Sequence, residues 1–108
     1  MKGTHLGEFE EIALLTILVL KNDAYGVSIK REINEQGKRS ISRGALHTAL
    51  SRLEEKGLLT SRQGQGNEDR GGRPKRYYEV SKKGMVALKE AKEVRDQLWV
   101  QIPSFNTQ

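Results

Sequence analysis

The chain has 108 residues, with 19 Lys and Arg against 14 Asp and Glu, so its net charge is +5. Its mean hydropathy is −0.68. This length corresponds to one domain with a modest core. The absence of cysteine excludes disulfides and cysteine-based zinc sites, and it fits a cytoplasmic location. The most apolar run has nine residues, whereas a membrane-spanning helix needs roughly 20, and the acidic N-terminus does not resemble a signal peptide.

Positive charge is concentrated in the middle of the chain. Residues 38–84 carry twelve cations and five anions, a net charge of +7. Such a centre indicates a surface for a polyanion or, alternatively, an ordinary solvated basic loop. The two histidines, His5 and His47, lie far apart, and no triad order, metal-ligand spacing or phosphate-binding P-loop ending occurs. We therefore predict no enzyme, no cofactor and no metal site.

The first two helices are expected at residues 6–20 and 24–36. Glutamates near the start of the first helix suit the positive end of its dipole. Its second half is apolar almost all round, which predicts a place at the centre of the core. Asp23 is expected to cap the second helix, whose apolar residues repeat every four positions, and Gly37 is expected to end it as a C′ glycine.

A third helix is expected between Ser42, a good N-cap, and Lys56–Gly57, a standard helix stop. One side of this helix is apolar and should be buried: Leu46, Ala49, Leu50 and Leu53. The other side lacks carboxylates and is rich in small polar groups and cations: Arg43, Gly44, His47, Thr48, Ser51 and Arg52.

Two strands are expected at residues 58–62 and 76–80, joined by a long, basic, glycine-rich loop. The loop is too long for a two-residue turn, and its glycines predict mobility. Because successive residues of a strand point to opposite faces, Tyr77 is expected to point outward and Tyr78 inward.

Ser81 is expected to cap a final helix of about twenty residues that ends before Pro103. Its apolar stripe is wider than a small core needs, which predicts a partner, and in homodimers that partner is often the same helix of a second copy. The residues expected in this interface are Leu88, Ala91, Val94, Leu98 and Ile102.

Three helices followed by a two-stranded ribbon is the order of a winged helix, with a helix-turn-helix formed by its second and third helices. We therefore predict a mainly α fold with a small antiparallel β-hairpin. Residues 1–84 would form the DNA-binding domain, and residues 85–108 the dimerisation helix and tail.

The third helix is the candidate for the major groove of DNA. Arg43 is expected to contact phosphate or guanine edges, and Thr48 and Ser51 to contact phosphate or bases. Gly44 permits close approach of the backbone. His47 lies at the border of the apolar face, where it either covers the core edge or contacts DNA. Arg52 completes this set.

The hairpin loop supplies further candidate DNA contacts. The GRP sequence around Arg73 is similar to the minor-groove AT-hook motif, although plain phosphate contacts are the simpler interpretation. The residues concerned are Arg70, Arg73, Lys75, Arg76 and Tyr77.

Four stretches resemble the PadR family of transcriptional regulators: GEFEEIALLTILVL, AYGVSIKREI, ISRGALHTALSRLEEKGLL and GGRPKRYYEVSKKG. Together they span roughly residues 6–102. The third stretch is the most specific match. The resemblance implies a winged-helix dimer that binds palindromic operator DNA, usually as a repressor, and the single final helix is similar to the short subfamily. The family commonly has tyrosine at the place of His47, where this chain has a shorter side chain.

The resemblance also implies that the last helix and the first one form the dimer, and that some members bind flat aromatic compounds beside a tryptophan of the last helix. Trp99 is the only tryptophan. It either lines such an effector site or merely packs the interface, as aromatic residues routinely do.

The alternative function is a winged helix that binds an acidic protein instead of DNA. RNA binding is a weaker option, because exposed aromatic residues for base stacking are lacking apart from Tyr77.

Overall fold

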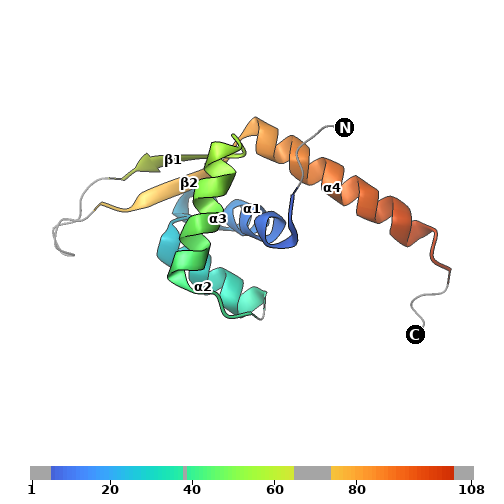
Figure 1. Ribbon diagram of the computed structural model, residues 1–108, viewed down its shortest axis with the longest axis horizontal. Helices are drawn as coiled ribbons and strands as arrows, with labels where there is room; N and C mark the ends of the chain where they lie inside the picture. Colours follow the sequence, from blue (N-terminus) through green and yellow to red (C-terminus); the bar gives the residue numbers. More distant parts are fainter. Residues whose placement is uncertain (1–5, 38, 65–73, 104–108) are drawn as a thin grey trace.

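The computed structural model describes residues 6–37, 39–64 and 74–103, and it confirms the predicted winged helix (Figure 1). None of its helices, within those residues, is long and apolar enough to cross a membrane. The elements, in chain order, are α1 (Glu8–Leu20), the 3-10 turn η1 (Lys21–Asp23), α2 (Gly26–Gln36), α3 (Arg43–Glu55), β1 (Leu59–Gln63), β2 (Arg76–Val80) and α4 (Lys82–Val100).

The core lies where α1, α2 and α3 meet beneath the hairpin. Leu14 and Ile17 of α1 pack against Ile29 and Ile33 of α2 and the apolar face of α3, and all of these side chains are almost fully buried. Helix α1 is therefore central, as expected, but only on one side. Its other side leaves Leu15, Leu18 and Val19 exposed by 45%, 38% and 64%.

Strands β1 and β2 form the wing, an antiparallel hairpin in which Leu59 lies opposite Val80 and Gln63 lies opposite Arg76. The other edge of β2 is also paired, because the Tyr78 amide donates to the Ala24 carbonyl at 2.9 Å and Tyr77 forms an isolated bridge with Tyr25. The chain between α1 and α2 thus acts as a third, very short strand. Strand β2 is held on both sides.

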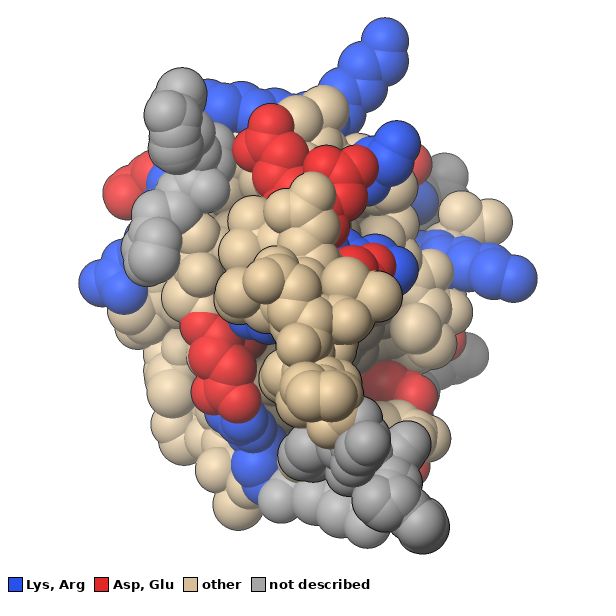
Figure 2. Space-filling model, turned by 90° about the vertical axis from the view of Figure 1, so that its right-hand side faces the viewer, with Lys and Arg blue, Asp and Glu red and all other residues tan. Residues whose placement is uncertain are grey.

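Helix α4 has two unlike halves. Its first turns belong to the core through Gly84, Ala87 and Leu88. Every residue from 92 to 100 is exposed, and this second half extends away from the other helices in Figure 1. Seen from that end, uncharged side chains run down the middle of the surface, with acidic and basic ones on both sides (Figure 2).

Several local expectations need correction. Asp23 does not cap α2: the N-cap is Tyr25, whose amide donates to Ser28 Oγ at 3.0 Å, and Asp23 only offers its backbone carbonyl to the same hydroxyl. Gly37 does end α2, but with φ −83° it lacks the left-handed conformation of a C′ glycine. Gly57, with φ +79°, adopts that conformation after α3. The wing strand β1 starts one residue later than expected.

Two ion pairs tie the start of α1 to the helix-turn-helix. Arg39 pairs with Glu8 at 2.9 Å, and Lys56 pairs with Glu10 at 2.9 Å. Burial raises the pKa of Glu10, but hydrogen bonds from the Gly7 amide and Lys56, with the nearby cations, outweigh it, so the pKa is lowered overall. The ionised carboxylate is therefore the form that suits the fold.

Candidate nucleic-acid interface

Helix α3 presents the predicted polar face to solvent. The Ser42 hydroxyl accepts a hydrogen bond from the Ala45 amide at 3.0 Å and fixes the first turn. The predicted apolar side is buried: Leu46, Ala49, Leu50 and Leu53. The opposite side is exposed, with Ser51 half-buried at its edge: Arg43, Gly44, His47, Thr48 and Arg52. His47 is thus an exposed side chain and not part of the core.

The polar face of α3 is free of carboxylates along its first ten residues. Acidic side chains occur only in the last turn, at Glu54 and Glu55. Glu54 is engaged within the protein, because its carboxylate accepts a hydrogen bond from the Ser61 hydroxyl at 2.5 Å. The exposed part of α3 therefore offers cations and neutral polar groups, the chemistry that suits phosphates and base edges.

Aromatic rings hold two cations at the end of the hairpin that adjoins its loop. The Tyr25 and Tyr77 rings meet edge to face, with centroids 5.6 Å apart. The Lys75 ammonium lies 4.1 Å from the Tyr25 ring, and the Arg62 guanidinium lies 5.0 Å from the Tyr77 ring. Such contacts are worth about 0.5–1 kcal/mol at exposed sites. Tyr77 therefore does not simply point outward: it is half-buried and serves as a platform for Arg62.

A chain of hydrogen bonds joins the wing to α3. Arg76 donates to the Ser61 hydroxyl at 2.9 Å, and Ser61 donates to Glu54. Tyr78 lies close by, and its pKa is raised by burial and then by the charge of Glu54, against a smaller opposing effect of Arg76. Arg76 is thus held against the protein while its side chain remains exposed.

The remaining predicted loop contacts, Arg70 and Arg73, lie outside the described residues.

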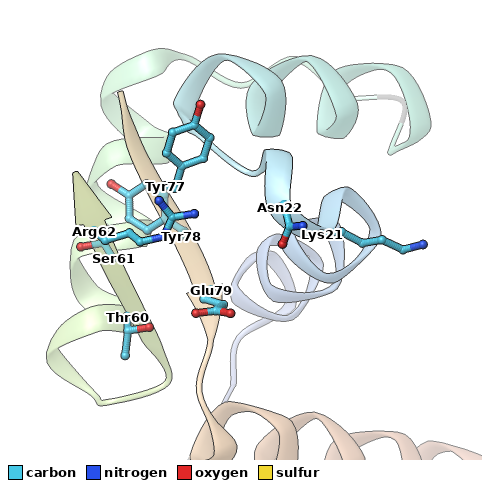
Figure 3. Close-up of a pocket in the computed structure, with 8 residues that line it drawn as sticks. All are labelled: Lys21, Asn22, Thr60, Ser61, Arg62, Tyr77, Tyr78 and Glu79. Atoms are coloured by element: carbon cyan, nitrogen blue, oxygen red, sulfur yellow. The ribbon is translucent and has the colours of Figure 1, made fainter. Parts of the chain in front are cut away.

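A small cavity of about 70 Å³ opens between the wing and η1. Figure 3 shows Thr60, Ser61 and Arg62 of β1 beside Tyr77, Tyr78 and Glu79 of β2, with Lys21 and Asn22 across from them. This volume suits a few water molecules and is well below the roughly 300 Å³ of ordinary ligand pockets.

Sequence reasoning missed a larger pocket between α2 and α3. It has a volume of about 540 Å³ and is lined by Gly26, Val27, Lys30, Arg43, Gly44, Leu46, His47, Leu50 and Tyr78. Val27 and Lys30 were not expected to share a surface with the third helix. The only sequence signal for this pocket is Val27. It is an apolar residue that lies outside the buried stripe of α2.

The predicted interface residues of α4 divide into two groups. Leu88 is only 7% exposed and belongs to the core of this chain, and Ala91 is half-buried. The other three are exposed by 45% to 60%: Val94, Leu98 and Ile102. Trp99, 52% exposed, lines a groove of about 420 Å³ between α4 and α1, together with Leu15 and Leu18.

Comparison with known proteins assigns this arrangement to a family. The model of the transcriptional regulator PadR-like family matches residues 14–90. The chain is 34% identical, over 77 residues, to the transcriptional regulator Rv3488 of Mycobacterium tuberculosis, and this covers 71% of the chain and 67% of the relative.

Solved structures share the fold. A PadR family regulator from Clostridium difficile R20291 has 27% identity and a TM-score of 0.67, covering 90% of this chain and 97% of that one. A PadR-like transcription factor from Bacteroides fragilis has 22% identity and a TM-score of 0.71, covering 91% and 89%. The chain therefore belongs to the PadR-like family of transcriptional regulators.

Proposed function

We propose that the protein is a homodimeric repressor that binds a palindromic operator in double-stranded DNA. The observation that carries the proposal is the exposed face of α3, where Arg43, His47, Thr48 and Arg52 stand free of carboxylates above a fully buried apolar side. A helix of this kind fits the major groove, and side chains of its first turns reach base edges.

The wing would contact the flanking phosphate backbone. Arg62 and Lys75 are already positioned by the Tyr77 and Tyr25 rings, so less side-chain freedom is lost when they meet phosphates. Arg70 and Arg73 are proposed as further phosphate contacts from the loop. Arg76 has a second role, since its bond to Ser61 connects the wing to α3.

Dimerisation is supported by the apolar surface that a single chain leaves uncovered. Val94, Leu98 and Trp99 of α4 and Val19 of α1 are all more than half exposed. Leu15, Leu18 and Trp99 line one groove between the two helices, and monomeric proteins rarely expose large apolar patches. A two-fold axis that pairs α4 with α1 and α4 of a second chain would cover it. Residues 1–84 would then read DNA and residues 85–108 dimerise, with the boundary inside α4.

The groove beside Trp99 is proposed as the place where a small aromatic effector releases the repressor. A ligand there would change the packing of the last helices and hence the distance between the two reading helices, which must match half-sites about one DNA turn apart. Titration of candidate aromatics against Trp99 fluorescence tests this, and unchanged emission across a broad panel contradicts it.

The test of the main proposal is DNA binding to the region upstream of the protein's own gene, measured by fluorescence anisotropy at two salt concentrations. Affinity should fall with salt at a log–log slope of about −0.9 per neutralised phosphate. Binding that does not depend on salt, or pairing with an acidic protein in place of DNA, would support the alternative of a protein-interaction module.

A further inference from the structure

The pocket between α2 and α3 has the composition of a ligand site. Its floor is apolar and rigid, since Leu46 and Leu50 are 3% and 2% exposed and belong to the core. Val27 forms an apolar wall that is 52% exposed. A volume of about 540 Å³ lies within the range of roughly 300–1,000 Å³ that is typical of small-molecule sites.

The rim of this pocket carries positive charge. Lys30 comes from α2 and Arg43 from the first turn of α3, and His47 stands one turn further along α3. Among the described residues that line the pocket, none is acidic. An apolar floor below two cations is complementary to a molecule with an apolar body and one negative group.

Duplex DNA alone does not account for such a pocket. Bases of a duplex stay stacked, and the apolar surface that they offer in the major groove is the methyl group of thymine. A methyl group needs only a small part of the volume between Val27 and Leu50. The remaining space suits a separate small molecule.

We propose that this pocket binds a small organic anion with an apolar body, and that such a ligand competes directly with DNA. Arg43, Gly44 and His47 line the pocket and also belong to the face of α3 proposed to read DNA. A ligand seated there occupies the same side chains that the operator needs. The competition rests on the DNA-binding function proposed above, whereas binding of the anion by the free protein does not.

The binding test uses 1-naphthoate and its neutral counterpart 1-naphthalenemethanol as probes, added to the full-length protein and followed by NMR. Naphthoate should shift the amide signals of Gly26 and Gly44, and any shift of the Trp99 indole signal should follow a separate binding curve. The neutral probe should bind about twofold to fivefold more weakly, since it forgoes a charge-assisted contact at a partly exposed site. Equal binding of the two probes, or a shift confined to Trp99, overturns the proposal.

Two test variants and one control, all on α2, locate the site. Lys30→Gln should weaken naphthoate binding by about the same factor as removal of the probe's charge. Arg31→Gln is the matched control, because Arg31 is the next residue of the same helix, is exposed and does not line the pocket. Val27→Glu, at a half-exposed position that does not support the core, should abolish binding of the anion. Equal losses in the Lys30 and Arg31 variants would show a nonspecific charge effect and overturn the site.

The competition test repeats the DNA titration with naphthoate present. The apparent dissociation constant for DNA should rise in proportion to one plus the ratio of free probe to its own dissociation constant. DNA affinity that is unchanged at saturating naphthoate overturns the competition. If the protein fails to bind DNA at all, the function proposed above fails, and the NMR mapping still decides whether the pocket takes the anion.

Discussion

Helix α3 and the second half of α4 both present a face to solvent, and the two faces are opposite in chemistry. The face of α3 consists of cations and small polar groups, which water solvates well. The face of α4 includes Val94, Leu98 and Trp99, which water does not. A polar face is stable in water, so it indicates which ligands it could bind but does not require one. An exposed apolar face is unfavourable in water, and it therefore predicts a partner that covers it.

The buried sides of the two helices differ as well. Helix α3 is anchored along its whole length by Leu46, Leu50 and Leu53. The apolar anchors of α4, Ala87 and Leu88, lie in its first turns, and further along the helix Arg95 pairs with Glu11 of α1. Helix α3 is therefore fixed by the apolar core of one chain, whereas the apolar side chains in the second half of α4 would gain their contacts only in the proposed dimer.

The largest effect is expected from a charge on the apolar face of α4. Leu98→Glu would place a carboxylate from each chain in the proposed dimer interface, where the cost of removing an ion from water is several kcal/mol. We expect the dimer dissociation constant to rise more than about a thousandfold, which is about 4 kcal/mol. Sedimentation equilibrium measures this. Glu93→Gln, an exposed position that does not line the α1–α4 groove, is the control, and an unchanged dimer in the Leu98 variant would break the comparison.

The corresponding change on α3 should leave the proposed dimer intact and weaken DNA binding. Arg43→Ala combined with Thr48→Ala deletes two exposed groups without touching the buried side of the helix. We expect operator affinity to fall by about 3 kcal/mol, roughly 150-fold, because each good base contact contributes about 1–3 kcal/mol. Anisotropy titrations measure the affinity, and thermal melting checks the fold. Full retention of binding would favour the protein-interaction alternative.

Two glycines test where each helix is tightly packed. A Cβ at Gly84 of α4 would lie 2.4 Å from the Leu58 carbonyl oxygen and 2.8 Å from Val80, whereas a Cβ at Gly44 of α3 meets nothing within 4 Å. Gly84→Ala should lower the free energy of unfolding by about 1–3 kcal/mol despite the better helix propensity of alanine.

Gly44→Ala is the matched substitution, and it should raise the free energy of unfolding by about 0.5–1 kcal/mol. Urea denaturation at one fixed protein concentration compares the two variants. If both glycines prove equally tolerant, α4 is not packed against the wing in the way described.

The smallest expected effect is a pH dependence at the junction of α1 and α3. Because the pKa of Glu10 is lowered in the folded protein, its ion pair with Lys56 contributes stability above the pKa of the unfolded chain. That contribution is lost as the pH falls through the lower, folded-state value. Glu10→Gln should reduce stability at pH 7 by about 1 kcal/mol or less and flatten the decline below about pH 4.5. Parallel melting curves of the two proteins in acid would contradict this assignment.

Most of the fold could be predicted from periodicity. The buried stripe of α3, the Ser42 and Ser81 caps and the limits of β2 all follow local rules, and the structure has them where the sequence indicates. The start of α2 did not follow, because Asp23 looks like an N-cap but belongs to η1, and the next two residues, Ala24 and Tyr25, are extended and pair with β2. A strand of two residues has no periodic signal, so its pairing depends on tertiary structure.

The candidate site was predictable where one element supplies it and not where two elements meet. The exposed face of α3 can be read from one helix alone. The support of Arg62 by Tyr77, and the pocket that joins Val27 and Lys30 to α3, require the crossing of separate segments. Helical spacing carries no information about that crossing.

The pairing of β2 on both edges gives the wing a mechanical connection to the helix-turn-helix. One edge is bonded to β1, and the other is bonded to Ala24 directly before α2. A force on the hairpin from the DNA backbone would therefore pull on the first turn of α2 as well as on the wing. The Tyr78 amide, which forms that bond, should exchange its hydrogen at a rate that reports whether the two parts move as one body.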